Sequence, residues 1–221
     1  MSGLVKALVF DFDGTIVDTE IVVYEAWAET FRRAGVEPID VDLWKGQIGL
    51  AETDPRCIDE AEVLCKALGV DALSAQIQSM RRSIRDEMLE QHGPRDGVTE
   101  WIAAAEAAGI PLAIGSSSPT EWVDMNLRRV GLRDHFEFLS CADPPTTGKP
   151  DPAVYLAVCA EFGVAPSDAL AIEDSHNGVA AAIAAGMRCI AAPGEMTQEA
   201  DLSAATIRVN SLAELAPADW L

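Results

Sequence analysis

The 221-residue sequence predicts an α/β protein with a parallel sheet and an all-helical insertion directly after the first strand. Two observations lead to this fold class. A buried apolar strand near the N-terminus is followed by a long stretch that shows only helical periodicity. From about residue 100, short apolar strands alternate with helices, which is typical of parallel strands covered by helices on both faces.

The first expected strand spans residues 4–10, an apolar run with β-branched residues that ends abruptly at Asp11. A helix is expected to begin near Asp18, because acidic residues fall in its first turn. Apolar side chains recur at four-residue spacing from Val23 to Phe31, and Gly35 lies beyond its last turn. The chain therefore leaves the sheet after one strand and enters a helix.

The next part of the chain, residues 39–55, is expected to be irregular. Two further helices are expected, because apolar residues mark one face from Ile58 to Leu68 and from Leu73 to Met88. The domain division that follows is residues 1–15 and 94–221 for the α/β core, and residues 16–93 for the helical domain.

In the second half the pattern becomes regular, and neither a repeat nor a low-complexity tract interrupts it. Further strands are expected at residues 110–114, 136–140, 169–172, 189–192 and 206–209. Further helices are expected at residues 100–108, 120–130, 152–162 and 179–185.

Composition excludes several classes of function. The chain has 36 acidic and 16 basic residues and a net charge of −20, so we expect no nucleic-acid partner, which would need clustered Lys and Arg. Scattered cysteines and histidines disfavour a zinc site. There is no uncharged apolar stretch of about 18 residues and no signal-peptide pattern, so we expect a cytoplasmic protein without a membrane partner. A monomer or a weak homo-oligomer is expected.

Polar side chains cluster where four of the expected strands end, and ligands of open parallel sheets bind at that edge. These residues are distant in sequence, but they should converge in space. They are Asp11 and Asp13, then Ser116 and Ser117, then Lys149, and finally Glu173 and Asp174.

The chemistry of these clusters is complementary. Carboxylates are the hard oxygen ligands that suit Mg²⁺, and a bound cation offsets the acidic charge of the chain. Asp11 is placed to attack phosphorus, and Asp13 could protonate a leaving oxygen and then deprotonate water. Ser116, with adjacent backbone N–H groups, and Lys149 could hold a phosphoryl group. Taken alone, the acidic pair supports only a metal site, with either carboxylate in either role.

The four ordered motifs DFDGTIVDTE, SSS, GKPDP and IEDSHNG resemble those of the haloacid dehalogenase-like superfamily. The resemblance covers about residues 4–18 and 94–195. It is to the subfamily with a helical cap between the first and second motifs, which includes β-phosphoglucomutase and many sugar-phosphate phosphatases. It implies a Rossmann-like parallel-sheet core and an inserted all-helical cap domain that closes over a small phosphorylated metabolite.

The resemblance also implies a role for each core residue. Asp11 would be nucleophile and metal ligand, and Asp13 the general acid and base, with its carbonyl on Mg²⁺. Phosphate would be held by Ser116, Ser117 and Lys149, and the metal site completed by Glu173 and Asp174. The function implied is a Mg²⁺-dependent phosphatase, with a sugar phosphate as substrate and an aspartyl-phosphate as intermediate.

Two alternatives remain. A β-phosphoglucomutase-type isomerase would need a cap histidine near Val23, where this sequence is apolar. A signalling receiver domain also combines a phospho-accepting Asp with a Lys on a parallel sheet, but receivers are shorter and lack the helical insertion.

Substrate choice is expected to depend on the helical insertion. Lys45, Gly46 and Gln47 could reach the closed site from the irregular segment. Arg81, together with Arg82 and Arg85, could contact an anionic sugar, and Trp44 could stack on a sugar ring or pack within the insertion.

Overall fold

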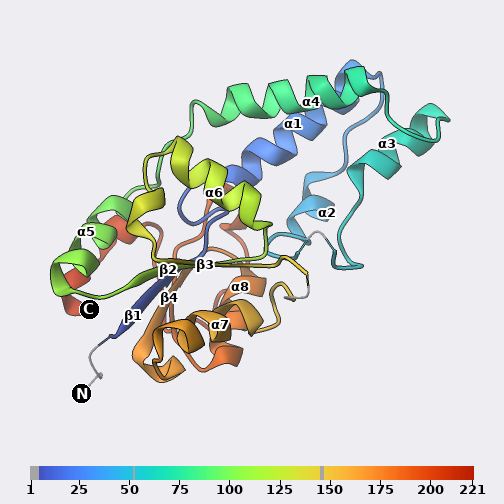
Figure 1. The fold of residues 1–221 in the computed structure, drawn as a ribbon. Helices are drawn as coiled ribbons and strands as arrows, with labels where there is room; N and C mark the ends of the chain where they lie inside the picture. The colour runs from blue at the N-terminus through green and yellow to red at the C-terminus, as the bar shows by residue number, and fades with distance from the viewer. Residues whose placement is uncertain (1–4, 52, 145–146) are drawn as a thin grey trace.

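The computed structural model describes residues 5–51, 53–144 and 147–221, and a six-stranded parallel sheet lies at its centre (Figure 1). The sheet order is β3-β2-β1-β4-β5-β6, so the first strand lies inside the sheet. The predicted fold class is confirmed, while Leu4, where the first strand was expected to begin, lies outside the described residues. The strands are β1 (Ala7–Phe10), β2 (Leu112–Ser116), β3 (Phe138–Cys141), β4 (Ala169–Glu173), β5 (Arg188–Ala191) and β6 (Ile207–Arg208).

Helices cover both faces of the sheet, as the alternating pattern predicted. On one face, α5 and α6 pack on larger strand residues such as Leu8 and Ile114. On the other, α7 and α8 pack on smaller ones such as Ala7 and Ala171. Figure 1 shows the two pairs on opposite sides of the strands. Their bounds are α5 (Val98–Ala108), α6 (Thr120–Arg129), α7 (Ala153–Phe162) and α8 (His176–Ala185).

Between β1 and α5 the described residues form four helices at one end of the molecule (Figure 1). Within residues 19–89, the described positions contain no strand. The helices are α1 (Thr19–Arg33), α2 (Val41–Lys45), α3 (Glu60–Leu68) and α4 (Ala75–Leu89). We call this part, residues 19–89, the helical segment.

The short helix α2 corrects the prediction of an irregular stretch at residues 39–55. The Asp40 carboxylate accepts hydrogen bonds from the backbone N–H groups of Asp42 and Leu43, which is the preferred way to satisfy a helix N-terminus. Trp44 within it is buried and packs edge-on against Tyr24 of α1. Packing within the segment, the second of the two expected roles, is therefore observed, and stacking on a sugar ring stays a prediction.

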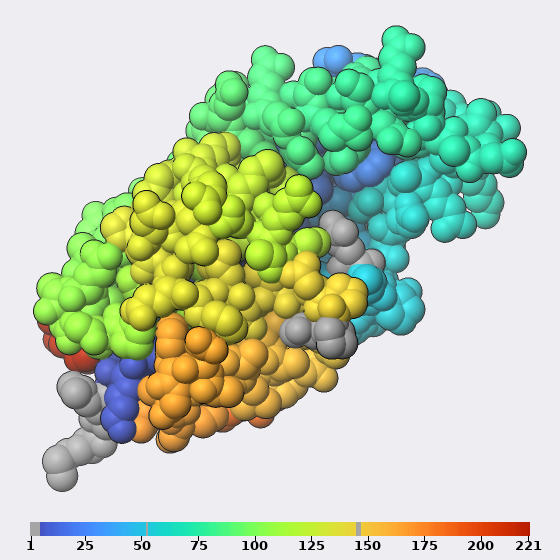
Figure 2. Space-filling view, viewed as in Figure 1, coloured from blue at the N-terminus to red at the C-terminus, as the bar shows by residue number. Residues whose placement is uncertain are grey.

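The helical segment has its own small core, built from Phe31, Leu64 and Leu73 with partly buried neighbours. The rest of the chain carries the sheet, and we call it the sheet-bearing part. A second apolar cluster joins the helical segment to it, because Trp44 and Ile48 pack with Met196. Figure 2 shows the segment, coloured blue to green, projecting beyond that part. Among the described residues, no helix combines the length and apolar character needed to cross a membrane.

Candidate active site

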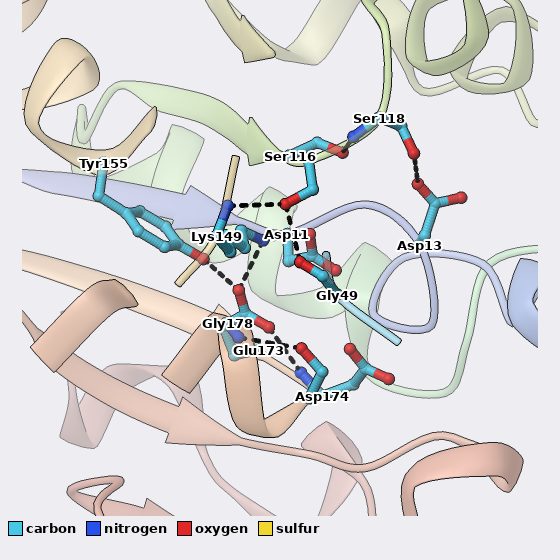
Figure 3. Close-up of polar contacts among 12 residues, drawn as sticks. Asp11, Asp13, Gly49, Ser116, Ser118, Lys149, Tyr155, Glu173, Asp174 and Gly178 are labelled. Carbon is cyan, nitrogen blue, oxygen red and sulfur yellow. Dashed lines mark hydrogen bonds and ion pairs between the residues drawn. The ribbon is translucent and has the colours of Figure 1, made fainter. Parts of the chain in front are cut away.

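The expected site residues meet at the carboxyl edge of the sheet (Figure 3). Asp11 follows β1, and Glu173 is the last residue of β4, which pairs with β1 in parallel. On the other side of β1, the strand β2 runs to Ser116, two residues further than predicted. Ser116 is therefore held in the sheet by its pairing with Cys141 of β3.

Lys149 is the buried cation of the site. Its ammonium lies 2.5 Å from Oδ1 of Asp11 and 2.6 Å from Oε1 of Glu173, and its side chain is 1% exposed. The Tyr155 hydroxyl of α7 donates to the same Glu173 oxygen. Lys149 and Tyr155 thus share one oxygen of Glu173, and its other oxygen accepts from the Asp174 N–H over 3.1 Å.

Asp174, the residue after Glu173, is also buried. Its Oδ2 accepts a hydrogen bond of 3.0 Å from Thr197, whereas its Oδ1 has no hydrogen-bond partner. Gly14, at φ +77°, brings the loop after β1 against this carboxylate, and a Cβ there would lie 2.3 Å from Oδ2. The loop can approach so closely because glycine tolerates this backbone conformation and has no side chain.

Three carboxylates offer oxygen atoms within 4.8 Å of one another, namely those of Asp11, Glu173 and Asp174. This all-oxygen set and the unpartnered Oδ1 of Asp174 fit a hard divalent cation such as Mg²⁺. Asp13, the fourth expected metal ligand, is expected to bind through its backbone carbonyl, so its carboxylate is not part of this group.

Burial and charge shift the pKa values of these groups. Burial raises the pKa of Asp11 to about 7, although Lys149 pulls it down. Burial and the charges of Asp11 and Glu173 hold the pKa of Asp174 well above its usual range. Burial works against the charge of Lys149, but the two adjoining carboxylates outweigh it and raise the pKa of Lys149. One cation does not balance three buried acids, so the site favours a second positive charge.

The Asp13 carboxylate accepts three side-chain hydrogen bonds. Thr19 and Trp122 donate to Oδ1 over 2.6 and 2.8 Å, and Ser118 donates to Oδ2 over 2.6 Å. Asp11 and Asp13 therefore differ in environment. Asp11 is buried against a cation, and Asp13 is partly exposed among neutral donors.

The two serines of the phosphate-binding prediction lie beside Lys149 but have different partners. Ser116 is 1% exposed, and its Oγ accepts from the Ser118 N–H. The Ser117 hydroxyl accepts from the Lys149 N–H and donates to the Gly49 carbonyl over 2.8 Å. Ser117 thus links the Lys149 loop to the helical segment.

A cavity of about 470 Å³ lies between the helical segment and this edge of the sheet. Its lining includes aromatic, acidic and basic side chains. Asp13, Ser118 and Trp122 line it from the sheet-bearing part, and Glu20, Val23, Trp27, Trp44, Gln47, Glu60, Arg81 and Arg85 from the helical segment.

Of the residues expected to set substrate choice, Trp44, Gln47 and Arg81 line the cavity. Lys45 and Gly46 are exposed outside its lining, and Lys45 lies 3.7 Å from Asp42. Arg82 is also exposed and outside the lining, whereas Arg85 is part of it.

Sequence reasoning missed the side chains that orient the acids, which are Thr19, Ser118, Trp122, Tyr155 and Thr197. It also missed Glu20, which lines the cavity and whose pKa is raised to about 8 by burial and by the charges of Asp13 and Asp11. One signal was readable. Thr19 and Glu20 are the last two residues of the first motif, so they had to lie near its acidic residues.

The fold and the site together define an enzyme with a parallel-sheet core and a carboxylate–lysine centre at its carboxyl edge. A model of the haloacid dehalogenase-like hydrolase family matches residues 5–186, and the chain belongs to that family. It is a phosphoric monoester hydrolase.

Individual relatives support the assignment of the chain to this family. The Bacillus subtilis protein YhcW, provisionally named a phosphatase, is 36% identical over 96% of this chain and 94% of its own. Hexitol phosphatase B of Escherichia coli is 30% identical over 98% of this chain and 97% of its own. The crystal structure of CbbY from Rhodobacter sphaeroides in complex with phosphate superposes with a TM-score of 0.76 at 29% identity, covering 96% of this chain and 97% of that one.

Proposed function

We propose that this enzyme hydrolyses the phosphate monoester of a small carbohydrate-like metabolite, with Asp11 as nucleophile and Mg²⁺ as cofactor. The observation that carries the proposal is the contact between Asp11 and Lys149, 2.5 Å apart in a buried site with two further carboxylates. A cation at this position holds the attacking oxygen and can neutralise charge on a transferring phosphoryl group.

The reaction would proceed in two steps. In the first, Asp11 attacks phosphorus, the bond to the ester oxygen breaks, and Asp13 gives its proton to the departing alcohol. In the second, Asp13 takes a proton from a water that attacks the phosphorus, the bond to Asp11 breaks, and inorganic phosphate leaves. Asp13 suits this role because it lines the cavity, where an alcohol or a water can reach it.

Mg²⁺ would be held by Asp11 and Asp174, with the Asp13 carbonyl as the family resemblance implies. When bound, the ion supplies positive charge that offsets the developing charge of the transferred group. The unpartnered Oδ1 of Asp174 supports this assignment. Glu173 would contribute through Lys149, because two donors already hold one of its oxygens.

The helical segment is proposed to act as a cap that selects the substrate. Its side chains form most of the cavity lining, and the mixture of tryptophans with charged groups suits a molecule with apolar ring faces and several hydroxyls. Hexitol phosphatase B and a phosphorylated carbohydrates phosphatase among the relatives support this class of substrate.

Val23 favours water over a second sugar hydroxyl as the final acceptor of the phosphoryl group. It lines the cavity at the place where the mutase alternative calls for a histidine. A mutase would also isomerise its substrate faster than it releases phosphate, which distinguishes the two. The family assignment and the helical segment leave no support for a receiver domain.

The test is release of inorganic phosphate from a panel of hexose, pentose and polyol phosphates, with Mg²⁺ and with EDTA. We expect Mg²⁺-dependent turnover by the wild type and loss of at least about 10³-fold in Asp11→Asn, with a phosphoenzyme trapped in the wild type alone. An Asp11→Asn variant that turns over normally would disprove the role of Asp11.

A further inference from the structure

Trp122 connects the Asp13 carboxylate to the helical segment. Its indole N–H donates to Oδ1 of Asp13 over 2.8 Å, and the Arg85 guanidinium lies 5.1 Å from the centre of a Trp122 ring. Trp122 belongs to α6 of the sheet-bearing part and Arg85 to α4 of the helical segment. One side chain thus touches both the proposed proton donor and the proposed cap.

The three donors to Asp13 are not equivalent. The hydroxyls of Thr19 and Ser118 rotate and can donate elsewhere, whereas an indole N–H points only along the plane of its ring. The direction of this donor is therefore set by the position of the ring. Arg85 helps to fix that position, since a guanidinium over an indole face is attracted by the ring electrons.

Arg85 is itself held in place. Its side chain is 17% exposed and lies along the cavity lining, and its guanidinium also pairs with Asp86 at 2.6 Å. It extends from α4 of the helical segment to Trp122 on α6 of the sheet-bearing part. This contact exists only while α4 is seated over α6.

We propose that Trp122 is a positioning residue that aligns the Asp13 carboxylate for proton transfer, and that Arg85 makes this alignment depend on the seating of the helical segment. Proton transfer to the departing alcohol is then efficient only when the segment covers the substrate. The inference rests on the proposed function, because it gives Asp13 the role of acid and base.

Leaving-group dependence tests the role of Trp122. The parameter kcat/KM reports steps up to loss of the alcohol, and p-nitrophenolate leaves without a proton whereas a sugar alcohol does not. In Trp122→Phe, which keeps an aromatic ring and removes the N–H, kcat/KM should fall about 10-fold or more for a hexitol phosphate. For p-nitrophenyl phosphate it should fall less than about 3-fold, because no general acid is needed.

Slower hydrolysis of the phosphoenzyme should also produce a burst of nitrophenol in Trp122→Phe, because Asp13 must also activate water. Equal losses on both esters, or no loss on either, would overturn the proposal, and thermal unfolding checks that the variant is folded. A wild type that hydrolyses neither ester would instead defeat the proposed function, so the two failures are distinct.

Arg85→Met tests the coupling. It keeps a long side chain, removes the charge, and should change the ratio of the two kcat/KM values in the same direction as Trp122→Phe. In the double variant the ratio should equal that of Trp122→Phe, because Arg85 acts through the N–H. Arg82→Ala, an exposed arginine of the same helix, is the matched control and should leave the ratio unchanged. Independent, multiplying effects of Arg85→Met and Trp122→Phe would contradict the coupling.

Discussion

Nζ of Lys149 lies 2.5 Å from Oδ1 of Asp11, and neither side chain is more than 7% exposed. The same ammonium lies 2.6 Å from Glu173, and Asp174 adds a third carboxylate to the group. The positive charge of Lys149 therefore lies in a buried group that contains three acidic side chains. Removal of that lysine should affect folding as strongly as it affects chemistry.

In Lys149→Met, we expect turnover to be lost and the free energy of unfolding at neutral pH to fall by roughly 3–5 kcal/mol, as for other buried pairs that lose one partner. The loss should shrink as the pH is lowered, because protonation removes the uncompensated carboxylate charges. Urea unfolding in EDTA at several pH values measures this loss in the free energy of unfolding. The control is Lys6→Met, because the exposed Lys6–Asp168 pair should be worth about 0–1 kcal/mol. Equal effects of the two substitutions would contradict this account of the charge balance.

Mg²⁺ binding should release protons and weaken as the pH falls. Burial raises the pKa of Asp11 to about 7 and that of Asp174 well above its usual range, so the metal-free site holds protons near neutrality. Carboxylates must lose these protons to bind a metal. Affinity should rise from pH 6 to pH 8, and calorimetry in buffers of different ionisation enthalpy should detect the protons. In Asp174→Asn the affinity should fall at least about 10-fold. Binding independent of pH would argue against these ligands.

The sheet and the acidic centre were predictable because the signals are local. Each strand is a short apolar run, and parallel topology brings the strand ends to one edge, so Asp11, Lys149 and Glu173 had to converge. The bounds of the expected strands differ from the observed ones by up to three residues, and the later end of β2 moved Ser116 from a loop into that strand.

The contact of Asp13 with Trp122 was not predictable, because it depends on how separate elements approach one another. Trp122 reads from the sequence as an ordinary residue of an amphipathic helix, and only the placement of α6 brings its N–H to Asp13. The same holds for Tyr155, which reaches Glu173 from α7. The helix α2 was missed although Asp40 provided a readable N-cap.

Gly49→Ala should disturb the contact between the helical segment and the sheet-bearing part. A Cβ at Gly49, where φ is +81°, would lie 2.5 Å from the Ser175 hydroxyl, and the Gly49 carbonyl accepts from Ser117. The control is Gly69→Ala, which has the similar φ of +68° but no atom within 4 Å of the added Cβ. Both should lose roughly 1–2 kcal/mol of stability from backbone strain. Only Gly49→Ala should also lower kcat/KM, by about 10-fold or more, because misplacement of the cap costs catalysis. Equal kcat/KM values in steady-state assays of the two variants would refute the role of this contact.

Glu20 should make the metal-free protein less stable as the pH rises. Burial and the charges of Asp13 and Asp11 raise its pKa from 4.5 to about 8, so between these values the folded chain keeps a proton that the unfolded chain has lost. Because the folded state binds more protons, the free energy of unfolding falls across this window and levels off above it.

Glu20→Gln removes this titration, so its stability relative to the wild type should rise from pH 5 to pH 8. Each pKa unit corresponds to about 1.4 kcal/mol, and the partial exposure of Glu20 reduces the full effect to roughly 1–3 kcal/mol. Urea unfolding in EDTA at several pH values gives the curve. Glu37→Gln, at an exposed position just beyond α1, should follow the wild-type curve. A Glu20→Gln curve parallel to the wild type would mean that Glu20 is ionised in the folded protein. The cavity would then present a permanent negative charge beside Asp13, and an anionic part of the substrate would have to lie against Arg81 and Arg85, the arginines of its lining.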